Sequence, residues 1–205
     1  MSLYETNISH RRVRLSWPTS RVVNHESSLK ARIGRACARK LVLYDCDLAL
    51  TYSTNRLAAE ELVAQLKHDH ETNVTSERYF RVSIHQGDLS KPEMCVKLYE
   101  EVRKAHGRPV DILVSNAGYG KRITDIWDIS VEEFEYTLSI NLTASFVLTK
   151  CVVDEMKTQH WGRIIYVSSI AAYGAGLNGC RESSSHHEPF FIFLPDQIMP
   201  PRKAV

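Results

Sequence analysis

Short apolar runs alternate with amphipathic stretches through most of the chain. The runs that predict strands cover residues 47–52, 81–86, 110–118 and 163–167. The stretches between them predict helices over 53–67, 91–105 and 138–157, and a capping box of Ser130 and Glu133 opens one more helix. Because each strand is apolar almost throughout, we expect a parallel sheet with helices on both faces, a doubly wound α/β fold.

The spacing of apolar residues also predicts which side of the helix over 53–67 faces the sheet. Leu57, Ala58, Leu62 and Leu66 fall on one side of this helix. We therefore expect these four side chains to pack against the strands.

Glycines and polar residues follow three of the predicted strands. They stand in GDL (87–89), SNAGYG (115–120) and SSIAAYG (168–174). Each alone is compatible with an ordinary turn between a strand and a helix. All three would meet at the carboxyl edge of a parallel sheet, where doubly wound folds bind ligands. The set therefore favours one shared ligand crevice.

Composition and charge narrow the class of partner. The chain has 205 residues, of which 43% are hydrophobic and 24% charged, and a formal net charge of +2. This balance favours neither nucleic acid nor an anionic membrane as a partner. The longest apolar runs are shorter than the roughly 20 residues that cross a bilayer. Five scattered cysteines predict reduced thiols and a cytoplasmic protein, and the histidines lack the further ligands of a metal site.

The motifs, taken in order, resemble the short-chain dehydrogenase/reductase family. The resemblance rests on NAG at 116–118, on Asn141 in SINLTASF and on GRIIYVSSIAAYG at 162–174, with Asp88 upstream. It covers about residues 32–180 and is closest in look to 3-oxoacyl-[acyl-carrier-protein] reductases. It implies a Rossmann-like domain over 1–180, incomplete at its C-terminal edge, followed by a non-homologous, poorly ordered tail over 181–205.

The resemblance implies cofactor-binding roles for residues at two strand ends. Asp88 would bind the adenine amino group, with Leu89 packed beside it. Asn116 would hold neighbouring strands together, and Ala117 and Gly118 would let the cofactor ribose approach closely. These are expectations from the family pattern.

The resemblance also implies a catalytic pair. Asn141 would interrupt its helix and help to order a proton-relay water, and Ser169 would donate a hydrogen bond to the substrate carbonyl oxygen. Relatives place a tyrosine about thirteen residues after this serine and a lysine four residues further on. Counting along this chain reaches Glu182 and His186 instead. The proton donor of the family is therefore missing from its usual position.

The glycine motif for the cofactor pyrophosphate is only partly present. Ile33 and Gly34 match its end, and a helix is expected from Arg35. The other two glycine positions of the family fall on Ser28 and Arg32. At these positions the backbone must approach the pyrophosphate closely, and a side chain would block that approach. A side chain would also strain any residue with a positive φ, so we expect weak cofactor binding.

Two placements of the first strand are compatible with the sequence. Residues 11–16 could form it, followed by an insertion, or residues 21–26 could form it, a choice that the spacing favours. We hypothesise that retained introns, a frameshift or an incorrect gene model replaced segments 14–31 and 181–205. The apolar PFFIFLP at 189–195 would then pack on the last strand or stay mobile.

The end of the second strand predicts the cofactor. An acidic residue there would bind the ribose 2′-hydroxyl of NAD. Residues 51–56 contain no acid, and Arg56 is within reach of a 2′-phosphate, which favours NADP over NAD. The plainer interpretation of Arg56 is a solvated residue in the first turn of a helix.

Two functions are compatible with these observations. The first is an NADP-dependent oxidoreductase that reduces a carbonyl of a small molecule, such as a 3-oxoacyl thioester. The second is an inactive remnant that binds a nucleotide or another subunit. The family forms homo-oligomers, which we do not expect here, because the partner helix would lie in the replaced region.

Overall fold

A six-stranded sheet forms the centre of the computed structural model, which describes residues 13–16, 29–75, 79–121, 123, 125–169 and 192–193. The strand order is β3-β2-β1-β4-β5-β6. The strands are β1 (Val13–Ser16), β2 (Asp47–Tyr52), β3 (Val82–Gln86), β4 (Val110–Ser115), β5 (Arg163–Tyr166) and β6 (Ile192–Phe193). The pairs from β1 to β5 are all parallel, which confirms the predicted fold class.

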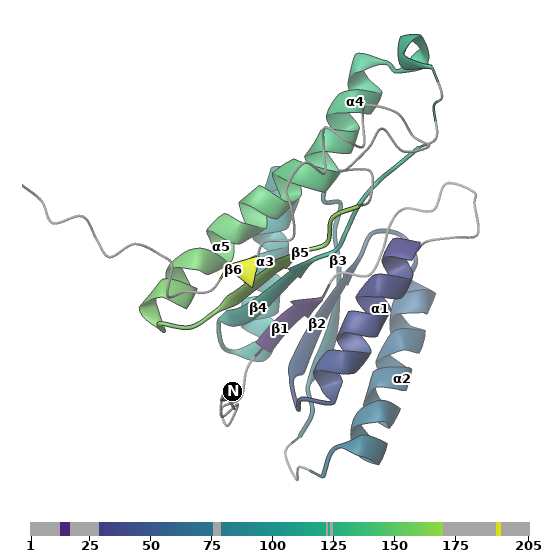
Figure 1. Cartoon of the computed structure of the whole chain (residues 1–205). Coiled ribbons are helices and arrows are strands. Elements are labelled where there is room, and N and C mark those ends of the chain that lie inside the picture. Colours follow the sequence, from purple (N-terminus) through teal and green to yellow (C-terminus); the bar gives the residue numbers. More distant parts are fainter. Residues whose placement is uncertain are drawn as a thin grey trace, which may run out of the picture.

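The central strand is Val13–Ser16, and the placement that the spacing favoured is wrong. β1 pairs with β2 on one side and with β4 on the other, so it occupies the middle of the sheet (Figure 1). Residues 21–26 lie outside the described residues. Arginine and serine alternate with Val13 and Leu15 in β1, and this alternation hides a central strand from a search for continuous apolar runs.

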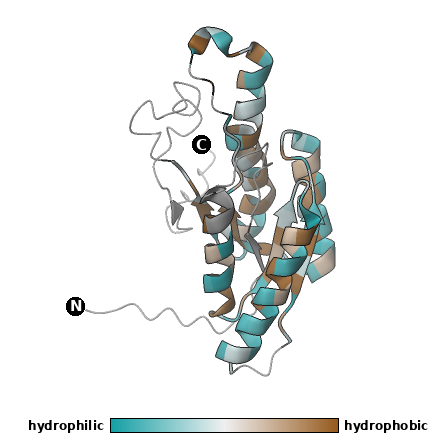
Figure 2. Cartoon of the chain, turned by 90° about the vertical axis from the view of Figure 1, so that its right-hand side faces the viewer, coloured by the Kyte–Doolittle hydropathy of each residue, from teal (hydrophilic) through white to brown (hydrophobic). Residues whose placement is uncertain are grey.

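Helices cover both faces of the sheet. They are α1 (Leu29–Val42), α2 (Arg56–Asn73), α3 (Pro92–His106), α4 (Val131–Leu138) and α5 (Ala144–Thr158), with the short helices η1 (Ile126–Asp128) and η2 (Ser139–Thr143). One apolar cluster lies between the sheet and α1 and α2, and a larger one lies between the sheet and α3 and α5. The outer sides of α1 and α2 are mostly hydrophilic (Figure 2).

The buried stripe of α2 differs from the prediction at its first turn. Ala59, Leu62 and Leu66 are buried, whereas the side chain of Leu57 is 73% exposed. Residues three and four apart share one side of a helix, and Leu57 lies five residues before Leu62, off that stripe. Ala58 is half-buried at the edge of the stripe.

The helical stretch from Val131 to Thr158 is long and apolar enough to span a membrane by length and composition. Core helices of soluble proteins satisfy the same criterion. Leu148, Val152 and Met156 of α5 are buried in the larger cluster, which gives this helix the inner face of a core helix.

The outer edge of β5 is paired with two residues from the tail. Ile192 and Phe193 form β6, which runs antiparallel to β5 and places Phe193 opposite Ile164. Of the two behaviours expected for the apolar tail segment, packing on the last strand is confirmed for these two residues. β6 therefore satisfies part of a strand edge that would otherwise expose unpaired backbone groups.

Candidate functional site

The carboxyl ends of β2, β3, β4 and β5 meet at one edge of the sheet because these strands are parallel (Figure 1). We call this the carboxyl edge. Asp88 lies just beyond β3, Asn116 just beyond β4 and Ser169 just beyond β5. The fold therefore places at the same edge of the sheet three predicted site residues that are far apart in the sequence.

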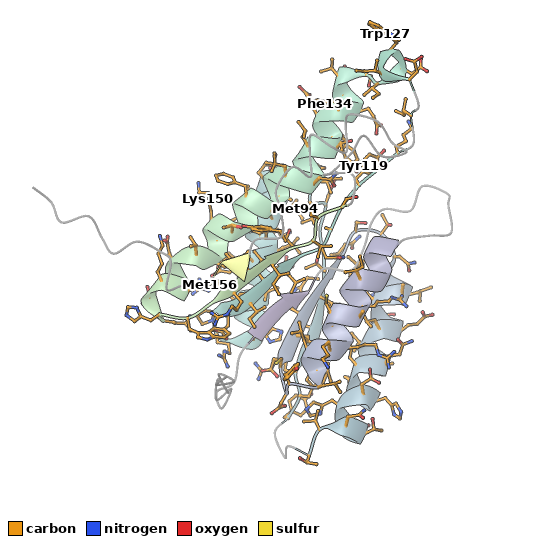
Figure 3. The ribbon with its side chains drawn as sticks, in the orientation of Figure 1. Met94, Tyr119, Trp127, Phe134, Lys150 and Met156 are labelled. Carbon is orange, nitrogen blue, oxygen red and sulfur yellow. The ribbon has the colours of Figure 1, made fainter. Side chains whose placement is uncertain are left out.

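The side chain of Asn141 fastens the loop after β4 to the long helix. Its Oδ1 accepts a hydrogen bond from the backbone N–H of Tyr119 at 2.7 Å, and its Nδ2 donates to the carbonyl of Tyr119 at 2.9 Å. Asn141 is buried within η2, a π-helical turn, so the predicted interruption of the helix is confirmed. The Tyr119 ring packs edge-on against Tyr136 of α4, with centroids 4.9 Å apart. Figure 3 shows Tyr119 beside the helix that carries Phe134.

The loop that Asn141 fastens contains the residues predicted to approach the ribose. Asn116 is 2% exposed, Gly118 is buried, and Ala117 packs against the larger apolar cluster. A hydrogen bond between two serine hydroxyls holds the start of this loop against α5. Ser115 Oγ lies 2.7 Å from Ser145 Oγ of that helix. The loop is therefore held by contacts at both Ser115 and Tyr119.

Ser169 is placed by the continuation of β5 beside β4. The N–H of Val167 donates to the carbonyl of Ser115 at 2.9 Å, which extends the parallel pairing past the last assigned residue of β5. Ser169 lies two residues further along and is half-buried. This places the predicted carbonyl-binding hydroxyl at the same edge as the loop held by Asn141.

Asp88 owes its position to the glycine before it. A Cβ on Gly87 would lie 2.3 Å from Cδ1 of Leu98 in α3, so a side chain there would force Leu98 to move. The N–H of Gly87 donates to the carbonyl of Tyr52 at 3.0 Å. Asp88 itself is exposed, and its Oδ1 accepts hydrogen bonds from both the N–H and the hydroxyl of Ser90. Sequence reasoning found Asp88 but missed the role of Gly87, whose signal was its place at a strand end.

Leu89 turns inward beside Asp88. It is half-buried and packs against the larger apolar cluster, so the expectation of an apolar neighbour for Asp88 fits its position. Whether Leu89 contacts adenine stays a prediction.

The end of β2 presents a different kind of surface. Asn55 caps α2 by accepting a hydrogen bond from the N–H of Ala58 at 3.0 Å. Arg56 is the first helical residue, and its Nε donates to Oε1 of Glu60 at 2.7 Å. Sequence reasoning assigned Arg56 but missed Glu60, although an arginine and a glutamate four residues apart on a helix are a known pairing signal.

The turn expected to hold the pyrophosphate is helical. α1 begins at Leu29 and not near Arg35, so Ile33 and Gly34 are its fifth and sixth residues. Only the first few N–H groups of a helix lack partners within it, so the N–H of Gly34 lies beyond the groups that could bind an anion. Arg32 is helical too, so the strain expected from a positive φ there does not arise. Glycine disfavours a helix at this position, whereas arginine favours one.

The residues at the carboxyl edge fit the adenosine half of a dinucleotide. The buried hydroxyl oxygen of Ser53, directly after β2, has no hydrogen-bond partner among the described residues. A buried hydroxyl of this kind at a strand end suits a ribose hydroxyl or phosphate oxygen. Glu182 and His186, at the positions where the family has its tyrosine and lysine, lie outside the described residues.

Known proteins resemble this chain in sequence. The family model described as short chain dehydrogenase matches residues 30–186. "NADPH-dependent aldehyde reductase-like protein, chloroplastic" of Arabidopsis thaliana is 28% identical over 138 residues, which are 67% of this chain and 51% of that protein. Human "Dehydrogenase/reductase SDR family member 4" is 40% identical over 85 residues, which are 42% of this chain and 30% of that protein.

Solved structures share the fold. A blue fluorescent protein from a metagenomic library, in complex with NADPH, has a TM-score of 0.68 at 26% identity, covering 86% of this chain and 63% of that one. A xylitol dehydrogenase with bound NAD⁺ has a TM-score of 0.68 at 24% identity, covering 86% of this chain and 60% of that one. The chain spans about half the length of the Arabidopsis relative.

Proposed function

We propose that this chain, which belongs to the short-chain dehydrogenase/reductase family, binds NADPH at its carboxyl edge and reduces a carbonyl, such as that of a 3-oxoacyl thioester. The observation that supports this most directly is the double hydrogen bond between Asn141 and the backbone of Tyr119. It fixes the loop after β4 beside the strand that carries Ser169. A cofactor loop and a carbonyl-binding hydroxyl are thereby held at one edge.

NADPH is the cofactor that the β2 end suits. The first turn of α2 contains no acidic residue, so none of its side chains offers a carboxylate to a ribose 2′-hydroxyl. Arg56 is exposed at this end and carries the charge that a 2′-phosphate needs. The Arabidopsis relative is named for NADPH dependence, and a solved relative at 26% identity holds NADPH.

Other residues of the chain would hold the rest of the adenosine. Asp88 would accept a hydrogen bond from the adenine amino group, since its carboxylate is exposed at the end of β3. Ala117 and Gly118 would offer a surface with little side chain next to the ribose, directly after the buried Asn116.

The proposed role of Ser169 is to stabilise negative charge on the substrate carbonyl oxygen. When bound, NADPH supplies a hydride to a carbonyl carbon, and the oxygen gains negative charge. A hydroxyl that already points at that oxygen stabilises the charge without reorganisation. Ser169 would be this donor, and Asn141 would help to order a water that relays a proton to the reduced oxygen.

Nucleotide binding without turnover is the second candidate, and the residue at 182 favours it. A glutamate at neutral pH accepts hydrogen bonds and does not donate a proton. Loss of a positioned general acid costs roughly 10²–10⁴ in rate. The helical pyrophosphate turn favours weaker binding in both candidates.

One experiment separates the two candidates. Tryptophan fluorescence is followed while NADPH is added to the whole chain, and NADPH oxidation is then measured with an acetoacetyl thioester. Saturable binding with turnover that Ser169→Ala removes supports the reductase. Saturable binding without turnover supports the second candidate. Absence of saturable NADPH binding contradicts both.

A further inference from the structure

We infer that Glu60 is a positioning residue that competes with the 2′-phosphate of NADPH for the guanidinium of Arg56, and so limits the preference for NADPH over NADH. This inference rests on the proposed binding of NADPH at the carboxyl edge. It concerns a residue that contacts the arginine and not the nucleotide.

The pair is close but open to solvent. Nε of Arg56 lies 2.7 Å from Oε1 of Glu60, while the side chains are 70% and 44% exposed. Ion pairs of this kind between exposed side chains are weak, because water screens them and two long side chains lose freedom. A phosphate dianion arriving at the arginine can therefore displace the carboxylate.

The position of the pair on the helix strengthens the competition. The N-terminus of a helix carries partial positive charge, which disfavours an arginine there and attracts an anion. A second guanidinium contacts the first turn of α2: Nη2 of Arg35 in α1 donates to the carbonyl of Ala58 at 3.4 Å. Glu60 is the carboxylate that neutralises Arg56 at this otherwise positive end.

Ser53 gives this end a second polar contact. Its buried hydroxyl oxygen has no hydrogen-bond partner among the described residues. Ser53 follows β2 and precedes Asn55 and Arg56, so the hydroxyl and the guanidinium flank the same strand end. A ribose that carries a 2′-phosphate has groups for both, whereas the ribose of NADH offers no negative charge to Arg56.

Glu61 provides a matched control. It is the next residue on the same helix and is also exposed, and its substitution changes the net charge equally. Successive helical residues point about 100° apart, so Glu61 faces away from the pairing that Glu60 makes with Arg56. A general effect of charge would appear in both variants, whereas a specific effect would appear only at Glu60.

The experiment compares Glu60→Gln, Glu61→Gln, Arg56→Gln and the double variant Arg56→Gln with Glu60→Gln. Dissociation constants for NADPH and NADH are measured by fluorescence titration at low and high salt. We expect Glu60→Gln to tighten NADPH binding about threefold at low salt and to leave NADH unchanged, with the gain shrinking at high salt. Glu61→Gln should change neither constant, and Glu60→Gln should have no effect once Arg56 is removed.

Each outcome decides the inference. If Arg56→Gln weakens NADPH binding but Glu60→Gln does not tighten it, the inference is wrong and the proposed function stands. If Glu60→Gln and Glu61→Gln act equally, or Glu60→Gln still acts without Arg56, Glu60 acts by general charge and the inference is again wrong. If wild-type protein binds neither nucleotide, the proposed function fails and the inference fails with it.

Discussion

The two edges of the sheet use their polar side chains in different ways. At the amino edge, where the strands begin, the buried Asp47 and His106 are hydrogen-bonded to neighbouring elements. At the carboxyl edge, they hold backbone loops in place or remain exposed. The difference separates residues that stabilise the fold from residues that are able to meet a ligand.

The amino edge carries a connected hydrogen-bond network. Oδ1 of Asp47 accepts from the N–H of Arg81 at 3.0 Å, and Nη1 of Arg81 donates to the carbonyl of His106 at 2.9 Å. The hydroxyl of Ser83 lies 2.8 Å from Nε2 of both His85 and His106. These contacts tie the start of β3 to the end of α3.

The carboxyl edge is held at fewer points. Asn141 binds the backbone of Tyr119, while Asp88 is exposed and accepts hydrogen bonds from Ser90. Arg56 is bound by one exposed carboxylate. Removing a side chain at the amino edge should therefore change stability alone, whereas removal at the carboxyl edge should also change nucleotide binding.

The largest effect is expected at the amino edge, for Arg108→Ala. Nη2 of Arg108 lies 2.9 Å from Oδ2 of Asp111, whose side chain is only 3% exposed. Removing the arginine takes a charged partner away from a buried carboxylate, and we expect the free energy of unfolding to fall by about 3 kcal/mol in urea titrations. NADPH affinity of the folded protein should not change.

The exposed pair of Arg39 and Asp69 is the matched control for this substitution. Its N–O distance is 2.7 Å, shorter than in the buried pair, but the arginine side chain is 59% exposed. Arg39→Ala should therefore leave stability almost unchanged. If Arg108→Ala and Arg39→Ala lowered the free energy of unfolding equally, burial of the carboxylate would not be what makes the Arg108 pair important.

An intermediate effect on stability, together with an effect on binding, is expected for Asn141→Ala. The substitution leaves both the N–H and the carbonyl of Tyr119 without the buried amide that now binds them. We expect the free energy of unfolding to fall by about 2 kcal/mol and NADPH binding to weaken, measured by urea titration and by fluorescence. Unchanged NADPH affinity in the folded variant would show that the loop after β4 does not need this clamp to bind nucleotide.

The smallest effect, counted per pH unit, is the dependence of stability on pH at the amino edge. Burial lowers the pKa of His106 from its ordinary 6.5 to about 4; Asp47 opposes this shift, and Arg81, His85 and Arg108 add to it. The folded protein therefore binds this proton less tightly than the unfolded chain. The contribution of neutral His106 to the free energy of unfolding is fully present above pH 6.5 and is lost as the pH falls towards 4.

The slope should reach at most about 1.4 kcal/mol per pH unit, the value for one proton. His106→Gln removes this titration, so its unfolding free energy should vary less with pH between 6.5 and 4 than that of the wild type. Urea titrations at several pH values measure both slopes. Parallel slopes would show that His106 accepts a proton as readily in the folded state as in the unfolded one.

The sequence predicts the repeating part of the fold well, because strand and helix periods are local signals. β2 matches the predicted residues 47–52, and the N–H of Glu133 donates to the hydroxyl of Ser130 as the capping box requires. β1 was assigned wrongly because it contains polar residues. The strand forms because it pairs with a neighbour on both sides, and that pairing exists only in the assembled sheet.

The site was predictable where a motif fixed it and not where packing did. Asn141 was identified from its motif, and the amide also proves to bind Tyr119, a contact that spans 22 residues. The start of α1 was misplaced, because a glycine motif implies a turn and the residues that replace its glycines favour a helix. Glu60 was missed because a charged residue on an exposed helix face is usually only solvated.

The π turn at Ser139–Thr143 also sets the rotational phase of α5. A π turn holds about one residue more than an α turn, and each helical residue advances the direction of its side chain by about 100°. α4 and α5 are thus two segments of one rod joined with an angular offset. That offset lets the rod turn Asn141 towards the loop after β4 and, seven residues later, turn Leu148 into the core. A single residue deleted within the turn would rotate all of α5 relative to the sheet.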